Sequence, residues 1–144
     1  MAEITVPQAI VNLALKLQGT PYIWGGNNPI TGFDCSGFCI WILQVFDRCE
    51  TGDWSSDGLR RKYPKVEIPS LGDLCLYGKY GAAKHVMLYI GKINGVDHCI
   101  GASGGDSGVR DYNEAARRNA KVKIKPVSYR TDFLGYHATG QLFA

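Results

Sequence analysis

The chain has 144 residues, a net charge of +3 and 45% hydrophobic residues. A chain of this length can bury one hydrophobic core without needing disulfide bonds or a structural metal, so we expect a single domain over residues 1–144. The five cysteines are odd in number and follow no disulfide framework, and no apolar run is long enough to span a membrane. No nucleic-acid motif or contiguous basic patch is present, so we expect no binding of DNA or RNA.

The first predicted element is a helix that begins near Pro7, a residue favoured at the first helical position. Apolar side chains share one face of this segment, and Gly19 is a typical stop. The helix should pack beside the next one.

A second helix begins at Asp34-Cys35-Ser36. Four apolar residues recur at the spacing of one helical face, namely Phe38, Trp41, Ile42 and Val45. Unpaired backbone N–H groups and the positive end of the helix dipole lie at such a start, which favours a thiolate over a thiol and predicts a depressed pKa for Cys35. The alternative is that Cys35 is a small buried residue beside a glycine turn.

The rest of the chain is predicted to form a sheet with short helices. The connector from Asp47 to Pro69 should be irregular, with a short helix around Ser56–Arg61. His85 opens an apolar run that ends at Ile90 and is typical of a core strand. After a glycine-rich loop, residues 112–119 are compatible with a helix, and 121–127 alternate like a half-exposed edge strand whose lysines face solvent.

Four ordered blocks of sequence together resemble one known family. They are Gly19-Thr20-Pro21-Tyr22-Ile23-Trp24-Gly25-Gly26, Phe33-Asp34-Cys35-Ser36-Gly37, Leu71-Gly72-Asp73-Leu74 and His85-Val86-Met87-Leu88-Tyr89-Ile90-Gly91. The chain resembles the NlpC-type cell-wall cysteine peptidases, a branch of the papain-like fold. The resemblance implies an α+β fold in which N-terminal helices, one bearing the nucleophile, pack on a central antiparallel sheet.

The resemblance also implies a function and the residues that perform it. The function is cleavage of an amide bond in the peptidoglycan stem peptide, typically between D-glutamate, through its side-chain carboxyl, and the following diamino acid. Cys35 matches the nucleophile, His85 the base and Tyr22 the oxyanion donor. The positions matched to substrate contacts are Asp34, Ser36 and Trp24. Asp34 and Ser36 have an equally ordinary explanation as residues that cap a helix.

The third catalytic position departs from the family pattern. In the family a His, Asn or Gln stands just before a pair of small residues and orients the base, but Gly101 occupies that place here. His98 cannot replace it, because the Asn94-Gly95 hairpin turn predicts that His98 lies opposite Gly91, roughly 20 Å along the ladder from His85. The orienting group is therefore expected to be Ser103, Asp106, a backbone carbonyl or a water. His98 and His137 should have structural roles.

No cofactor and no metal are expected, since neither histidine nor cysteine spacing matches a zinc site. The N-terminus lacks the features of a signal peptide, so we expect synthesis in the cytoplasm and action at the cell wall. The routes left open are a phage particle with tail proteins as partners, which we favour, release through a holin at lysis, a dedicated secretion system, or a leader absent from this sequence. Two other classes of function stay open. One is an acyltransferase or amidase on the same fold, and the other is a non-catalytic wall-binding or tail-structural module.

Overall fold

The computed structural model describes residues 3–140. The helices are α1 (Val6–Lys16), α2 (Cys35–Val45), α3 (Ser56–Lys62) and α4 (Tyr112–Arg117), with a 3₁₀ turn η1 (Val127–Tyr129). The strands are β1 (Asn27–Asn28), β2 (Gly32–Phe33), β3 (Lys65–Val66), β4 (Leu74–Lys79), β5 (Ala82–Ile93), β6 (Val96–Ser103), β7 (Lys121–Pro126) and β8 (Phe133–His137). None of the helices in this part of the chain has the length and apolar character needed to cross a membrane.

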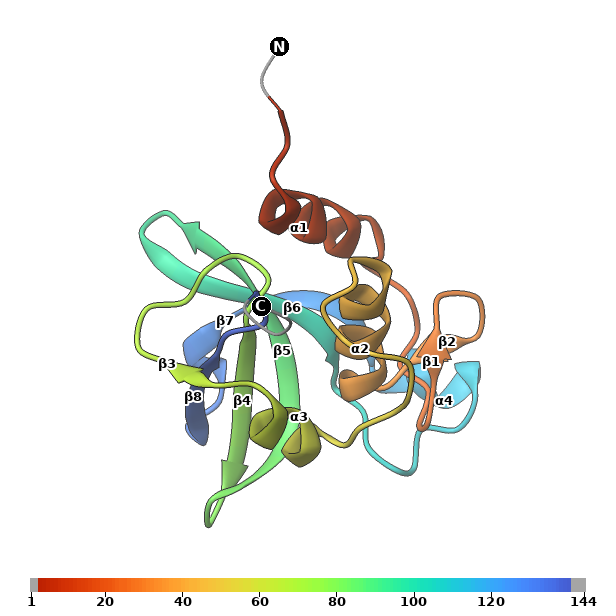
Figure 1. Cartoon of the computed structure of the whole chain (residues 1–144). Helices are drawn as coiled ribbons and strands as arrows, with labels where there is room; N and C mark the ends of the chain where they lie inside the picture. The colour runs from red at the N-terminus through yellow and green to blue at the C-terminus, as the bar shows by residue number, and fades with distance from the viewer. Residues whose placement is uncertain (1–2, 141–144) are drawn as a thin grey trace.

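The central feature is a six-stranded sheet with the order β3-β8-β4-β5-β6-β7. All of its paired neighbours run antiparallel. Figure 1 shows α1 and α2 stacked beside the sheet and α3 near the end of β5 at which His85 lies. This arrangement confirms the predicted α+β fold with a central antiparallel sheet.

Strand alternation divides the core between the two faces of the sheet. One face packs on α1 and α2 through residues such as Leu76, Val86 and Leu88. The alternate side chains make a second cluster on the other face, and its buried members are Cys75, Tyr77, Met87, Tyr89, Cys99 and Val127. The β5 strand therefore contributes to both clusters, and His85 is in phase with the second one.

Local sequence signals explain where the elements begin and which strand forms the edge. Asp34 caps α2, with its side chain accepting a hydrogen bond from the amide of Gly37 at 2.7 Å. The helix predicted around Ser56–Arg61 is present as α3. β7 is the edge strand that its alternating lysines predict.

The hairpin between β5 and β6 has the register that its turn predicts. Asn94 and Gly95 both have positive φ, at 51° and 79°, as a tight two-residue turn between twisted strands requires. Gly91 pairs with His98, which confirms the expected placement of His98 far from His85. The ring Nδ1 of His98 lies 2.7 Å from the carbonyl of Val96, so this ring bonds to its own hairpin.

Candidate active site

A cleft of about 600 Å³ opens where the N-terminal ends of α2 and α3 meet the first residues of β5. Its walls carry charged groups of both signs, with Asp53 and Asp106 among the acidic residues and Lys84 and Arg130 as the basic ones. Of the residues predicted from sequence for catalysis or substrate contact, all but Ser103 line the cleft, namely Tyr22, Trp24, Asp34, Cys35, Ser36, His85 and Asp106. The cleft thus brings together segments that are far apart in the chain.

Cys35 is the first residue of α2, as predicted, and its sulfur faces α3 and β5. The Sγ atom lies 3.7 Å from the hydroxyl of Ser56, the first residue of α3. The Ser56 hydroxyl and the backbone amide of Val86 both favour the thiolate, yet burial outweighs them and raises the pKa of Cys35 above its usual value. The expectation of a depressed pKa is therefore wrong for the free protein, because α3 and β5 pack over the start of α2 and shield Cys35 from water.

Ser56 is a site residue that could not be recognised from the sequence, since nothing in its local pattern distinguishes it from any other serine at a helix start. We expect Ser56→Ala to raise the pKa of Cys35 further and to slow its alkylation by iodoacetamide about threefold to tenfold, because a hydrogen bond is worth roughly 0.5–1.5 kcal/mol. The measurement is the pH dependence of the alkylation rate, with thermal unfolding as the check on folding. An unchanged profile in a folded variant would remove Ser56 from the site.

Tyr22 lies beside the thiol and is held there by backbone contacts. Its amide donates to the carbonyl of Ala120 at 3.0 Å, and a side chain added at Gly105 would collide with its ring, so the glycine-rich loop packs directly on it. Burial raises the pKa of Tyr22, and the charge of Cys35 is the next cause, which reflects how close the two groups are. The phenol stays protonated at neutral pH and is available as a donor.

The loop that carries Tyr22 and Trp24 fits tightly against the start of α2. A Cβ atom added at Gly37 would lie 2.1 Å from the carbonyl oxygen of Gly26, so only glycine permits this approach. The same carbonyl accepts a hydrogen bond from the amide of Asp34 at 3.0 Å. These contacts fix the distance between Tyr22 and Cys35.

The two polar residues that flank Cys35 are engaged within the protein. Asp34 accepts hydrogen bonds from the amides of Gly37 and Gly25, at 2.7 and 3.1 Å, and from the Ser36 hydroxyl at 3.3 Å. These bonds fit the capping explanation. A role in substrate contact stays a prediction for both residues, as it does for the half-exposed Trp24.

His85 stands at the start of β5 and is 8% exposed. Its Nε2 atom lies 2.7 Å from the hydroxyl of Tyr129 in η1. Burial, and then the positive charge of Arg130, lower the pKa of His85 to about 3. The imidazole is therefore neutral at neutral pH, with Nε2 occupied and Nδ1 left as the nitrogen that can serve the thiol. Thiol–imidazole contacts in sites without substrate are often long and tighten on binding.

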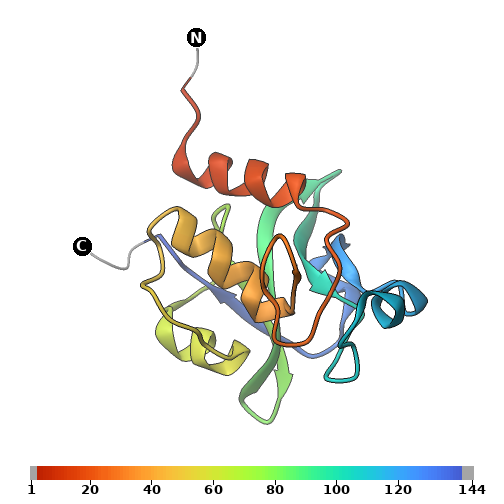
Figure 2. The same cartoon turned by 90° about the vertical axis from the view of Figure 1, so that its right-hand side faces the viewer.

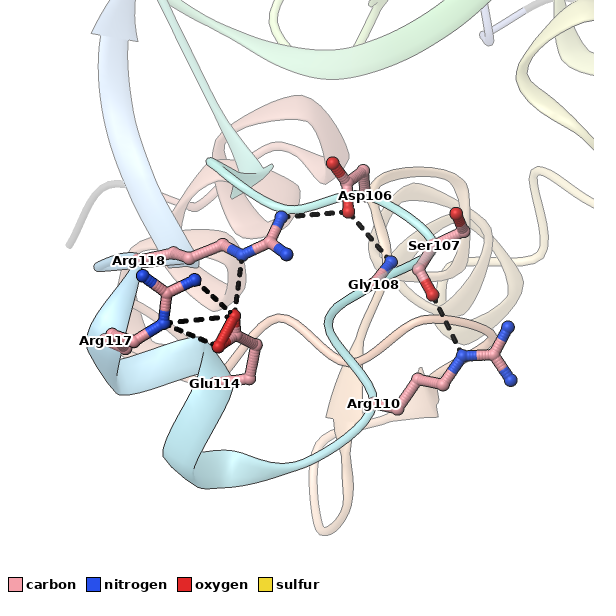
Figure 3. A network of polar contacts seen from close by, with 7 residues as sticks. All are labelled: Asp106, Ser107, Gly108, Arg110, Glu114, Arg117 and Arg118. Carbon is pink, nitrogen blue, oxygen red and sulfur yellow. Dashed lines mark hydrogen bonds and ion pairs between the residues drawn. The ribbon is translucent and has the colours of Figure 1, made fainter.

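The group that contacts the base differs from the expected set. Ser103 forms a hydrogen bond with Tyr129, whose pKa is raised by burial despite this bond, so the contact of Ser103 is with Tyr129 and not with His85. The carboxylate of Asp106 is turned to its own loop, where it accepts from the amide of Gly108 at 2.8 Å and pairs with Arg118 at 2.9 Å (Figure 3). Tyr129 is 44 residues from His85, and no pattern in the sequence connects the two.

The charged network in Figure 3 braces the loop that borders the cleft. Glu114 of α4 binds the guanidinium groups of Arg117 and Arg118, and Arg118 reaches back to Asp106. The glycine-rich loop between β6 and α4 is thus fixed by α4 on one side and by the Tyr22 ring on the other. Figure 2 shows this loop and α4 standing out from the sheet.

Asp57 joins α3 to the β5 end of the cleft. Its carboxylate accepts from the amide of Ala83 at 2.8 Å and pairs with Arg60 and Arg61. These contacts, the Ala83 amide first, hold the pKa of Asp57 well below its usual value. The carboxylate thereby keeps the thiol-contacting end of α3 against the strand that carries His85.

We expect the stabilisation from Asp57 to depend on pH. A carboxylate with a lowered pKa in the folded state stabilises fully above the unfolded value, near 3.8, and this contribution is lost as pH falls through the folded pKa. Denaturant unfolding of the parent and of Asp57→Asn should differ most near neutral pH, and the difference should shrink below about pH 3. An equal difference at neutral pH and below about pH 3 would show that the charge of Asp57 does not contribute to holding α3 against β5.

His137 has a structural role, as expected. Its Nδ1 atom lies 2.7 Å from the carbonyl of Tyr63, and the side chain is buried at the end of β8. Burial lowers the pKa of His137. The ring ties β8 to the segment that follows α3, away from the cleft.

Comparison with known proteins identifies relatives over the segment that builds the cleft. Residues 19–127 match the model of the NlpC/P60 family. Protein P54 of Enterococcus faecium is 41% identical over 88 residues, which is 58% of this chain and 16% of that protein. The bifunctional muramidase/DL-endopeptidase CwlT of Bacillus subtilis (strain 168) is 35% identical over 88 residues, 58% of this chain and 26% of CwlT. The chain thus spans about a quarter or less of the length of these two relatives.

A solved structure extends the likeness to nearly the whole chain. The NlpC/p60 domain of the peptidoglycan hydrolase SagA superposes with a TM-score of 0.67 and 26% identity, covering 93% of this chain and 98% of that domain. The matched region includes both Cys35 at the start of α2 and His85 on β5. The sequence match and the common architecture lead to one conclusion: the chain belongs to the NlpC/P60 family.

Proposed function

We propose that this protein is a cysteine endopeptidase of the bacterial cell wall that hydrolyses an amide bond in the peptidoglycan stem peptide. The observation that carries the proposal is the cleft in which Cys35 at a helix start, the phenol of Tyr22 and the buried imidazole of His85 share one space. Names of relatives support the same class, since CwlT is named a DL-endopeptidase and SagA a peptidoglycan hydrolase.

The first half of the reaction forms a thioester. Nδ1 of the neutral His85 takes the thiol proton while Sγ of Cys35 attacks the amide carbonyl carbon. The developing oxyanion is stabilised by the Tyr22 hydroxyl and the backbone N–H at Cys35, and each such donor is typically worth about 10²–10³ in rate. The imidazolium then returns the proton to the leaving amine nitrogen as the C–N bond breaks.

The second half restores the free thiol. Nδ1 of His85 takes a proton from a water molecule, and the resulting hydroxide attacks the thioester carbon. The C–S bond breaks, and the proton on His85 neutralises the departing thiolate. The sum is one amide and one water converted to one carboxylic acid and one amine, with Cys35 and His85 unchanged.

The charges that line the cleft are suited to a substrate that carries both positive and negative groups. Acidic and basic side chains share its walls, and a stem peptide offers carboxylates together with the amine of its diamino acid. We propose the bond between the side-chain carboxyl of D-glutamate and the diamino acid as the one cleaved. The phage-associated setting and phage tail partners remain predictions from sequence.

The test is mass spectrometry of defined peptidoglycan fragments incubated with the protein in water labelled with oxygen-18. Hydrolysis predicts one new amine and one new carboxyl that carries one labelled oxygen, at a single stem-peptide bond. The control is protein whose Cys35 thiol has been alkylated with iodoacetamide, because Cys35 is partly exposed whereas the other four cysteines are buried. Products without the label would point to acyl transfer, and no product from several wall chemotypes would overturn the proposal.

A further inference from the structure

The place that the family pattern reserves for an orienting side chain is filled by something else in this protein. A Cβ atom added at Gly101 would lie 2.7 Å from the sulfur of Met87 on the neighbouring strand. The Met87 side chain therefore occupies the space beside Gly101 on the face of the sheet where His85 stands. No group on β6 at this position can reach the base.

The group that contacts Nε2 of His85 is Tyr129, and not a side chain at position 101. Its hydroxyl lies 2.7 Å from Nε2, and the two rings meet edge to face with centroids 6.3 Å apart. Tyr129 comes from η1, which follows β7, so the contact is made by a different segment from the one in the family pattern.

The segment that carries Tyr129 is itself firmly placed. The fully buried Tyr77 donates its hydroxyl proton to the carbonyl of Val127 at 2.7 Å, and its ring packs against Tyr129 with centroids 5.6 Å apart. Immediately after Tyr129, Arg130 forms a two-bond pair with Asp132 at 2.9 and 2.7 Å. A side chain held on both sides can orient a neighbour with little loss of freedom on binding.

We propose that Tyr129 is the positioning residue of the His85 base, and that it replaces from η1 the orienting group that is missing at Gly101. This inference rests on the proposed function. Burial raises the pKa of Tyr129 to about 12, so the group is a neutral phenol under working conditions. Its oxygen accepts a hydrogen bond from the Nε2–H of the neutral imidazole, which leaves the lone pair of Nδ1 free to take the thiol proton.

The proton balance of the reaction is unchanged by Tyr129. The Nε2 proton stays on His85 throughout, and the transferred proton enters and leaves at Nδ1. When His85 becomes an imidazolium, the hydrogen bond from Nε2 to the Tyr129 oxygen becomes charge-assisted and stronger. Tyr129 thus fixes the tautomer and the ring orientation without exchanging a proton itself.

The test compares steady-state hydrolysis of a wall fragment by the parent, Tyr129→Phe and Tyr136→Phe. Phenylalanine at position 129 keeps the ring and removes only the hydroxyl. We expect kcat to fall about tenfold to a hundredfold with KM within about twofold, because general-base catalysis supplies roughly 10²–10⁴ and orientation is a part of it. Tyr136→Phe removes a phenol of the same aromatic cluster that bonds Asp97 at 3.0 Å, and its kcat should match the parent.

A second readout separates this inference from the proposed function. The rate of Cys35 alkylation needs no substrate, and it should fall in Tyr129→Phe but not in Tyr136→Phe, because the imidazole is the acceptor of the thiol proton. If the parent cleaves no wall fragment but this difference in alkylation appears, the positioning role stands and the peptidoglycan substrate does not. If Tyr129→Phe folds and both kcat and the alkylation rate stay within about twofold of the parent, Tyr129 is only a packing residue.

Discussion

Replacing Cys35 with alanine is expected to abolish amide hydrolysis, with a loss of at least about 10⁴ in kcat. The variant removes the only protein atom that forms a covalent bond with the substrate in the proposed mechanism, and the oxyanion donors alone cannot form a thioester. The measurement is the rate of fragment release by mass spectrometry. Binding of the fragment should survive, because the walls of the cleft are unchanged.

The matched control is Cys39→Ala, one turn further along the same helix. Cys39 is fully buried in the core between α2 and the sheet, and burial raises its pKa well above the usual value. The control removes a thiol from the same helix without touching the cleft, so its kcat should stay near that of the parent. Residual hydrolysis by Cys35→Ala at more than about a hundredth of the parent rate would refute the thioester mechanism.

The second large effect is expected from His85→Ala, which should lower kcat by about 10²–10⁴. Without the imidazole, the thiol has no acceptor for its proton, and the burial that raises the pKa of Cys35 keeps it protonated. Since His85 acts on the reacting atoms and not on distant parts of the substrate, KM should change much less than kcat. Steady-state kinetics on a defined fragment separates the two.

His98→Ala is the control for this experiment. His98 lies on the neighbouring strand, paired with Gly91, and its ring bonds the carbonyl of Val96. Its removal tests whether any histidine of the sheet would serve as the base. A loss of kcat in His98→Ala comparable to that in His85→Ala would contradict the assignment of the base.

The sequence predicted those parts of the fold whose causes are local. The spacing of apolar residues and the cap at Asp34 define α2, and the Asn94-Gly95 turn sets the β5–β6 register, which in turn excluded His98 from the site. The family resemblance added the pairing of Cys35 with His85, two residues that no local pattern connects. Both kinds of signal belong to short, contiguous stretches of sequence.

The parts that could not be predicted depend on contacts between distant segments. Tyr129 reaches His85 because η1 folds over the face of the sheet opposite α1 and α2. No local pattern in residues 127–129 predicts that contact. The pKa of Cys35 differs from the prediction for a related reason. A helix start favours a thiolate, but the packing of α3 and β5 over Cys35 determines how far it is desolvated. The sequence around Cys35 does not predict its burial by other segments.

The protonated resting state of Cys35 has a consequence for how long the protein survives before it meets a substrate. Peroxide oxidises the thiolate and not the thiol, and the first product, a sulfenic acid, would end nucleophilic attack. Because burial raises the pKa of Cys35, we expect the idle sulfur to be oxidised more slowly than a free thiolate. The nucleophile becomes reactive when His85 takes its proton as it attacks a bound amide, so slow oxidation and catalytic reactivity belong to different states of the same cleft.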